Sequence, residues 1–390
     1  MNKIFCLYII IIFFVSKNVI TTLSMDGNWF TFLEIVLALL LIISYKNNVL
    51  KEYRTIKYVL IFLALFCSYK LFSDRSQGIR AYSLTVLCPP IVLASLPQLK
   101  CNQPLWSRFL KIYVNFFAIE CFVAIVERTF HHNIFLLDND LTGNIGGFEA
   151  FRSYGFLGHP LQNALVVSIM MSFILVSNIK RKYWLWGLGF ISLLCFEARA
   201  SIVGNLVVFL VHILWKNFNE RKFRLVKLVN SMALILAGGI IMLISFNLGL
   251  GARLMNQGLV DDKSAQVRLD IWSIFDWYSL TDFMYGLDFE RVEFIMETLK
   301  LPATENFWID YLFRFGFIFL CVMIILYYKL CKSLYSGYPK FNILITACTF
   351  IVLSSTNNSL SAYWLPLFVF LFSILLFSNQ FNSRINTCYK

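Results

Sequence analysis

The chain has 390 residues, of which 59% are hydrophobic and only 14% are charged. A soluble globular chain carries roughly 25% charged residues, so this composition excludes an ordinary soluble domain and indicates a protein whose solvent is the lipid bilayer. The net charge of +12 would suit a nucleic-acid partner, but the basic residues fall in short segments between apolar runs. That placement is typical of membrane proteins, and we expect no nucleic-acid partner.

Apolar runs follow one another along the chain, and each is long enough, or nearly so, to cross a membrane as a helix. The twelve runs cover residues 4–23, 29–45, 58–72, 81–96, 109–126, 161–178, 183–196, 201–215, 226–248, 307–328, 341–354 and 362–377. We therefore predict an all-α polytopic membrane protein with about 12 transmembrane helices, built as a single membrane domain over residues 1–390.

Lysine and arginine gather in alternate connections between these runs, as in Lys180-Arg181-Lys182 and in Lys329 with Lys332. Short cytoplasmic connections of membrane proteins carry such an excess. The pattern predicts that both termini face the cytoplasm. Two long connections, residues 127–160 and 249–306, then lie on the opposite side of the membrane, where we expect the function.

The second long connection is acidic, with ten carboxylates against five basic residues. We predict a helix over residues 264–280 that lies along the membrane surface, because it carries aromatic residues such as Trp272 and Trp277. Residues 288–299 place Val292, Ile295 and Met296 on one face, which predicts a second, amphipathic helix.

Three arginines in these outer segments are candidate ligands for an anionic substrate. Arg268 lies one turn before Trp272, and its alternatives are an ion pair with Asp262 or a lipid phosphate. Arg199 lies in a very short connection between two runs, where an arginine can also extend to the membrane interface. Arg152 lies in the first long connection, residues 127–160.

Arg152 is followed by Tyr154 and by Gly158-His159-Pro160, so three polar side chains precede the run at 161–178. Either they meet at one site, or they form only a capped helix start.

The run at 307–328 begins with Glu305-Asn306 and contains Asp310 and Arg314. An arginine inside a membrane needs a partner, and Asp310, four residues earlier, is the one we expect. Glu305 and Asn306 form either an N-terminal cap or the polar rim of a cavity, where a carboxylate can act as a general base.

We expect neither a metal nor an organic cofactor. The ten cysteines include no C-x-x-C pair, and His131 and His132 are adjacent, which is poor spacing for two ligands on one helix face. The sequence also has no Walker loop, no dinucleotide-binding fingerprint and no HExxH.

Three patches give the chain a resemblance to the O-antigen polymerase and O-antigen ligase superfamily. They are Arg152-Ser-Tyr-Gly-Phe-Leu-Gly-His-Pro160 with Asn163, Ala198-Arg199-Ala-Ser201, and Ser264-x-x-x-Arg268-x-x-x-Trp272 followed by Glu305-Asn306 and Gly316. The resemblance covers about residues 152–316. The chain departs from the family pattern at Ala198, where serine is frequent, and at Glu305, where ligases usually have histidine.

The resemblance implies a membrane-embedded glycosyltransferase of the GT-C type in the bacterial inner membrane. It would transfer a glycan from undecaprenyl diphosphate to a sugar hydroxyl on the periplasmic face, without a metal. Arg199 and Arg268 would hold the diphosphate, Glu305 would be the base, and the substrate-binding residues would be Arg152, Tyr154, His159, Asn306 and Arg314.

Three functions stay open at this point. The first is a polymerase that joins repeat units into O-antigen or capsular polysaccharide, with a chain-length regulator as an expected partner. The second is a ligase that moves the glycan to lipid A core. The third, from another class, is a flippase or transporter of the lipid-linked glycan, for which we expect ionisable residues at mid-membrane.

Overall fold

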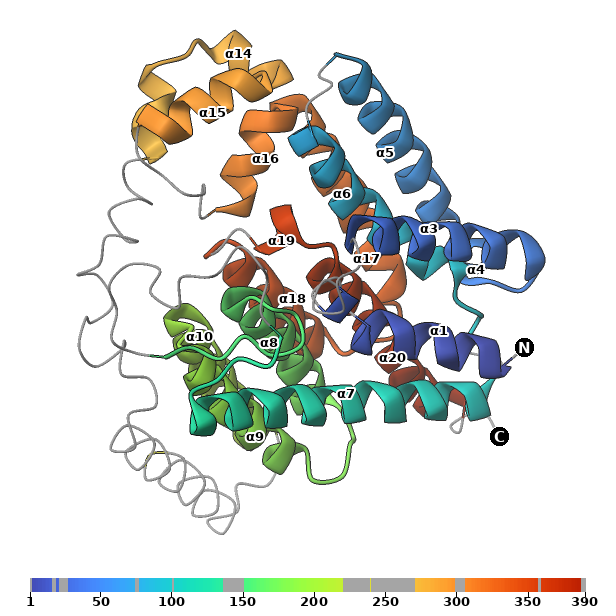
Figure 1. Ribbon diagram of the computed structural model, residues 1–390. Helices are drawn as coiled ribbons and strands as arrows, with labels where there is room; N and C mark the ends of the chain where they lie inside the picture. The colour runs from blue at the N-terminus through green and yellow to red at the C-terminus, as the bar shows by residue number, and fades with distance from the viewer. Residues whose placement is uncertain are drawn as a thin grey trace.

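The computed structural model describes residues 2–15, 19–20, 27–73, 77–99, 102–135, 151–219, 239, 271–298, 306–356 and 359–386. Within these residues the secondary structure is helical, apart from one isolated bridge between Asn48 and Pro97. The helices are α1 Asn2–Phe14, α3 Gly27–Ser44, α4 Val49–Glu52, α5 Arg54–Ser73, α6 Gln77–Ser95, α7 Gln103–Phe130, α8 Pro160–Val176, α9 Lys182–Phe196, α10 Arg199–Asn219, the 3-10 helix η1 Ile271–Asp276, α14 Leu280–Tyr285, α15 Phe289–Thr298, α16 Phe307–Phe315, α17 Phe317–Leu334, α18 Lys340–Ser354, α19 Ser359–Ala362 and α20 Leu365–Asn386 (Figure 1).

Three of these helices are long and apolar enough to cross a membrane, namely α7, α17 and residues 199–217 of α10. Seven further apolar helices of 10–17 residues accompany them in the described part of the chain. Many large apolar side chains in the described helices are exposed, such as Leu65 and Phe72 on α5 and Ile325 on α17. An all-helical protein with such surfaces fits a membrane-embedded fold.

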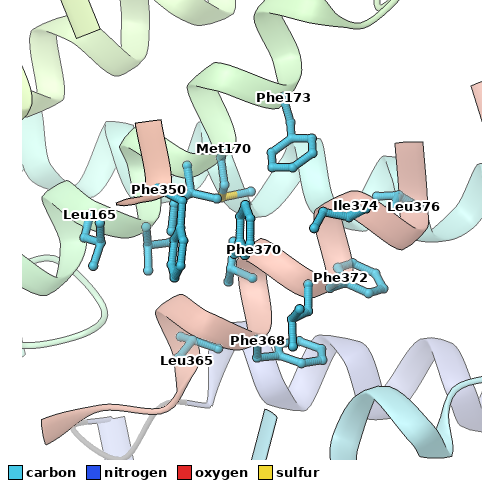
Figure 2. Packing of buried hydrophobic residues seen from close by; sticks show 14 of the residues in the cluster. Leu165, Met170, Phe173, Phe350, Leu365, Phe368, Phe370, Phe372, Ile374 and Leu376 are labelled. Atoms are coloured by element: carbon cyan, nitrogen blue, oxygen red, sulfur yellow. The ribbon is translucent and has the colours of Figure 1, made fainter. Parts of the chain in front are cut away.

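Helix α8 lies at the centre of the bundle, where it packs against α9, α10, α18 and α20. Nearly all of its side chains are buried, as expected for a helix that is apolar on every face. Its serines direct their hydroxyls back to the helix, as Ser168 does to the carbonyl of Ala164 at 2.6 Å, so these hydroxyls are hydrogen-bonded within the helix. Figure 2 shows the aromatic packing beside it, where Phe350 of α18 stacks on Phe370 of α20 with centroids 4.0 Å apart.

Most of the expected spans have a helix at the same place in the chain, although α1 ends at Phe14. The expected span at 226–248 falls outside the described residues, except for residue 239. The single span expected at 307–328 is wrong, because the chain breaks at Gly316 into α16 and α17. Gly316 has φ of 86°, and its backbone lies so close to Gly286 that a side chain at either glycine would overlap the other segment.

The helix expected over residues 264–280 is also wrong in its described part. Residues 271–276 form a 3-10 helix, and α14 begins separately at Leu280. Ser279 starts this new helix, because its backbone N–H and its hydroxyl both donate to the Asp282 carboxylate, at 3.1 and 2.6 Å. The amphipathic helix expected at 288–299 is confirmed as α15, and it packs with η1 and α14 on α16 around a small core that includes Ile274, Phe283, Ile295 and Phe313.

Candidate functional site

The segment from Phe151 to His159 folds onto a carboxylate at the end of α7. Glu127 is fully buried, and its Oε2 accepts hydrogen bonds from the backbone N–H groups of Tyr154 and Gly155, both at 2.8 Å. Its Oε1 accepts the N–H of Ile134, also at 2.8 Å. Charged acceptors form strong hydrogen bonds in a low-dielectric interior, so Glu127 holds both ends of the connection between α7 and α8.

Glu120 lies two helical turns before Glu127 on α7 and also accepts a hydrogen bond from this segment. Its Oε2 accepts the Phe156 N–H at 3.2 Å, whereas Oε1 is buried and has no hydrogen-bond partner among the described residues. Gly155 has φ of 56°, and a side chain there would overlap the Glu120 carboxylate. Asn163 of α8 donates to the Tyr154 carbonyl, which ties the segment to the start of that helix.

Arg152 and Ser153 lie against the turn that joins α9 to α10. The Arg152 Nε donates to the Phe196 carbonyl and the Ser153 N–H to the Cys195 carbonyl, both at 3.2 Å. Helix α9 ends at Phe196, Glu197 adopts the left-handed conformation with φ of 54°, and α10 begins at Arg199. Two of the predicted arginine patches, more than forty residues apart, therefore meet at one end of the bundle.

A buried ion pair fixes this turn to α7. Arg128 Nη1 lies 3.2 Å from Glu197 Oε1, and both side chains are at most about a tenth exposed. A pair of charges in such surroundings is strongly destabilised when one partner is lost, because the other is then a buried single charge. The pair thus holds the start of α10, where Arg199 lies half-buried, in a defined place.

His159 occupies the N-cap position of α8 without a side-chain capping hydrogen bond, and its ring lies 6.2 Å from that of Tyr363. Burial, and secondarily the charge of Arg152, lower the pKa of His159 to about 4. The imidazole is therefore neutral at neutral pH, and can donate or accept a hydrogen bond without adding charge.

In the third patch, the side chain of Asn306 caps α16 by accepting the N–H groups of Trp308 and Ile309 at 2.9 and 3.3 Å. The Trp308 indole donates to Ser355 Oγ at 2.7 Å, at the end of α18. The expected ion pair is confirmed, with Arg314 Nε 2.9 Å from Asp310 Oδ1 and both side chains buried. The Nε of Arg314 is thus paired within α16.

Helix α19 joins this patch to the first two, because it contacts both α16 and α8 (Figure 1). Tyr363, which follows α19, is the residue that reaches the His159 ring. Arg152, Tyr154, His159, Arg199 and Asn306 consequently belong to one end of the bundle. Glu305 and Arg268 lie outside the described residues.

The sequence analysis missed three residues of α7 that hold the neighbouring segments in place, namely Glu120, Glu127 and Arg128. A signal was present, since two glutamates seven residues apart lie on one face of an otherwise apolar helix. Ionisable residues inside a membrane helix are costly and therefore serve a purpose.

The arrangement brings Arg152, the turn before Arg199 and the neutral imidazole of His159 to one end of the bundle. Guanidinium groups match phosphate oxygens in a planar, two-bond geometry, so the site suits a phosphorylated or diphosphate ligand. Among the described residues no group of three or more histidine, cysteine, aspartate or glutamate side chains is arranged to hold a metal ion.

A scan against protein-family models matches no family, and a search of curated proteins finds no significant match.

Proposed function

We propose that this chain is a membrane-embedded glycosyltransferase related in kind to the O-antigen polymerases. It would join undecaprenyl-diphosphate-linked repeat units into O-antigen or capsular polysaccharide on the periplasmic face of the bacterial inner membrane. One observation carries the proposal: Arg152 and the turn before Arg199 are in contact, through the hydrogen bond from Arg152 to the Phe196 carbonyl. The sequence alone suggested these two patches separately.

The proposed reaction needs groups that recognise a diphosphate and groups that handle one proton. The acceptor hydroxyl attacks the anomeric carbon, the bond from that carbon to the diphosphate oxygen breaks, and the proton passes to a base. We assign the base to Glu305, next to the Asn306 cap, and the diphosphate to Arg199 and Arg268, with support from Arg152. Negative charge grows on the diphosphate as the bond breaks, so fixed guanidinium groups stabilise the transition state more than the ground state.

The proposal includes a membrane arrangement of about twelve spans with both termini in the cytoplasm. Positive residues between α8 and α9, and in the last turns of α17, support this orientation. Reporter fusions after Lys182 and Lys332 are expected to report the cytoplasm, and a fusion after Glu149 the periplasm. A periplasmic signal after Lys182 would contradict the orientation.

The central experiment compares Arg199→Ala and Arg199→Lys in a strain deleted for the gene, with polysaccharide banding scored at matched membrane levels of protein. Removing one donor to the developing charge costs roughly a hundredfold in rate. Lysine should rescue poorly, because an ammonium lacks the planar two-bond geometry. Arg54→Ala is the matched control, since Arg54 is exposed at the start of α5.

The pattern of bands separates the outcomes. A polymerase defect leaves a single repeat unit on the lipid, whereas a ligase defect leaves none. Normal polymer in Arg199→Ala would make Arg199 an interfacial anchor and remove the basis of the proposed site.

A further inference from the structure

An open pocket lies where α5 begins and α17 ends. Its cavity measures about 520 Å³ and is lined by Glu52, Tyr53, Thr55, Lys329, Lys332, Ser333 and Ser336. The pocket residues on and just after α17 come before α18 in the chain. Ser355, which contacts Trp308 of the candidate site, comes directly after α18. The length of α18, about 22 Å for 15 residues, therefore separates the two places.

The lining has the chemistry of a site for a singly charged anion. Lys329 and Lys332 are exposed and carry two positive charges, and Glu52 is half-buried and carries one negative charge, which leaves one positive charge in balance. The lining also contains hydroxyl groups, of which Thr55 Oγ1 and Ser333 Oγ are hydrogen-bonded to each other at 3.2 Å. Lysine binds phosphate as a point charge, and hydroxyls donate to its oxygens.

Apolar surface continues from the pocket along both helices that form it. Ile325 lies one turn before Lys329 on the same face of α17, and 51% of it is exposed. Tyr58 lies one turn after Thr55 on α5, and 64% of it is exposed. A charged pocket that opens onto exposed apolar helix faces matches a molecule with an ionic head and hydrocarbon tails.

We propose that this pocket binds the phosphodiester headgroup of a phospholipid from the membrane leaflet on its own side. The phosphate lies between Lys329 and Lys332, and the acyl chains lie along Ile325 and Tyr58. The site serves to hold the ends of α5 and α17 together at the membrane surface. It does not rest on the glycosyltransferase proposal, because it shares no residue with the candidate site.

The test uses the purified full-length protein, delipidated in detergent and titrated with phosphatidylglycerol, with bound lipid measured by native mass spectrometry. The double variant Lys329→Ala/Lys332→Ala removes both cations. The matched control Lys57→Ala/Lys340→Ala removes two exposed lysines that do not line the pocket. A third variant, Ser336→Asp, leaves the lysines in place and adds a negative charge to the lining.

We expect the dissociation constant of the tightest-bound lipid to rise roughly thirtyfold in the pocket double variant, since each of the two basic residues near a lipid phosphate contributes on the order of 1 kcal/mol. It should rise in Ser336→Asp as well, and stay unchanged in the control. An equal loss in both double variants would mean diffuse attraction and overturn the pocket. Inorganic phosphate alone is the second probe: a thermal stabilisation equal to that from phosphatidylglycerol would overturn the lipid assignment.

Discussion

Replacing Glu127 with alanine should release the segment 151–159 from the end of α7. The carboxylate of Glu127 accepts the backbone N–H groups of Tyr154, Gly155 and Ile134, each at 2.8 Å. Alanine leaves all three donors without this acceptor. Glutamine keeps one carbonyl oxygen but loses the charge, so Glu127→Gln should have an intermediate effect.

The size of the effect follows from the three contacts. A hydrogen bond to a charged group contributes roughly 1.5–3 kcal/mol, which sets an upper limit of about 9 kcal/mol for three such bonds. The bonds share one carboxylate and are not additive, and Ile134 is an exposed residue. We therefore expect a loss of about 4 kcal/mol for Glu127→Ala and about 2 kcal/mol for Glu127→Gln.

Hydrogen exchange of the protein in lipid nanodiscs measures this directly. A loss of about 4 kcal/mol corresponds to a drop of nearly a thousandfold in the protection of the Tyr154 and Gly155 amides. Glu293→Ala, which removes an exposed carboxylate from α15, is the control and should leave that protection unchanged. Protection within threefold of the original protein in Glu127→Ala would refute the assignment of Glu127 as the residue that holds the segment.

Three further predictions follow from the same region. Gly155→Ala should lower the melting temperature by several degrees, because a side chain there overlaps a buried carboxylate. Gly187→Ala is the control and should not lower it, because the added atom meets nothing within 4 Å. Equal shifts in the melting temperature of the two variants would contradict this prediction. Arg128→Ala and Glu197→Ala should each cost about 3–5 kcal/mol in unfolding free energy, and a double variant that loses the full sum would show that the two are not coupled. His159 has a pKa of about 4 when folded, below its ordinary value of 6.5, so the unfolded chain binds the extra proton and stability should fall as the pH drops from about 6.5 to 4. His159→Gln should flatten that slope in thermal unfolding measured against pH, and an unchanged slope would assign the dependence to another group.

Local rules predicted much of this molecule. Apolar runs predicted the position of most of the apolar helices that the structure describes, because a helix satisfies its own backbone hydrogen bonds and needs only an apolar surface to lie in lipid. The i,i+4 spacing predicted the ion pair between Asp310 and Arg314, which forms at 2.9 Å. Residues 288–299 were assigned correctly as an amphipathic helix, which is α15.

Contacts between segments far apart in the sequence determined the features that local rules did not predict. The break at Gly316 depends on the close approach of Gly286, thirty residues earlier, which no helical periodicity encodes. The clamp of Glu127 on Tyr154 and Gly155 closes a connection of more than twenty residues, and the gain from three charged hydrogen bonds has to offset the entropy of that closure. Composition and periodicity were enough to predict a helical, apolar protein and to locate its charged residues. Only the tertiary structure decided that Arg152 meets the turn before Arg199, because that contact needs α7, α8 and α9 packed together first.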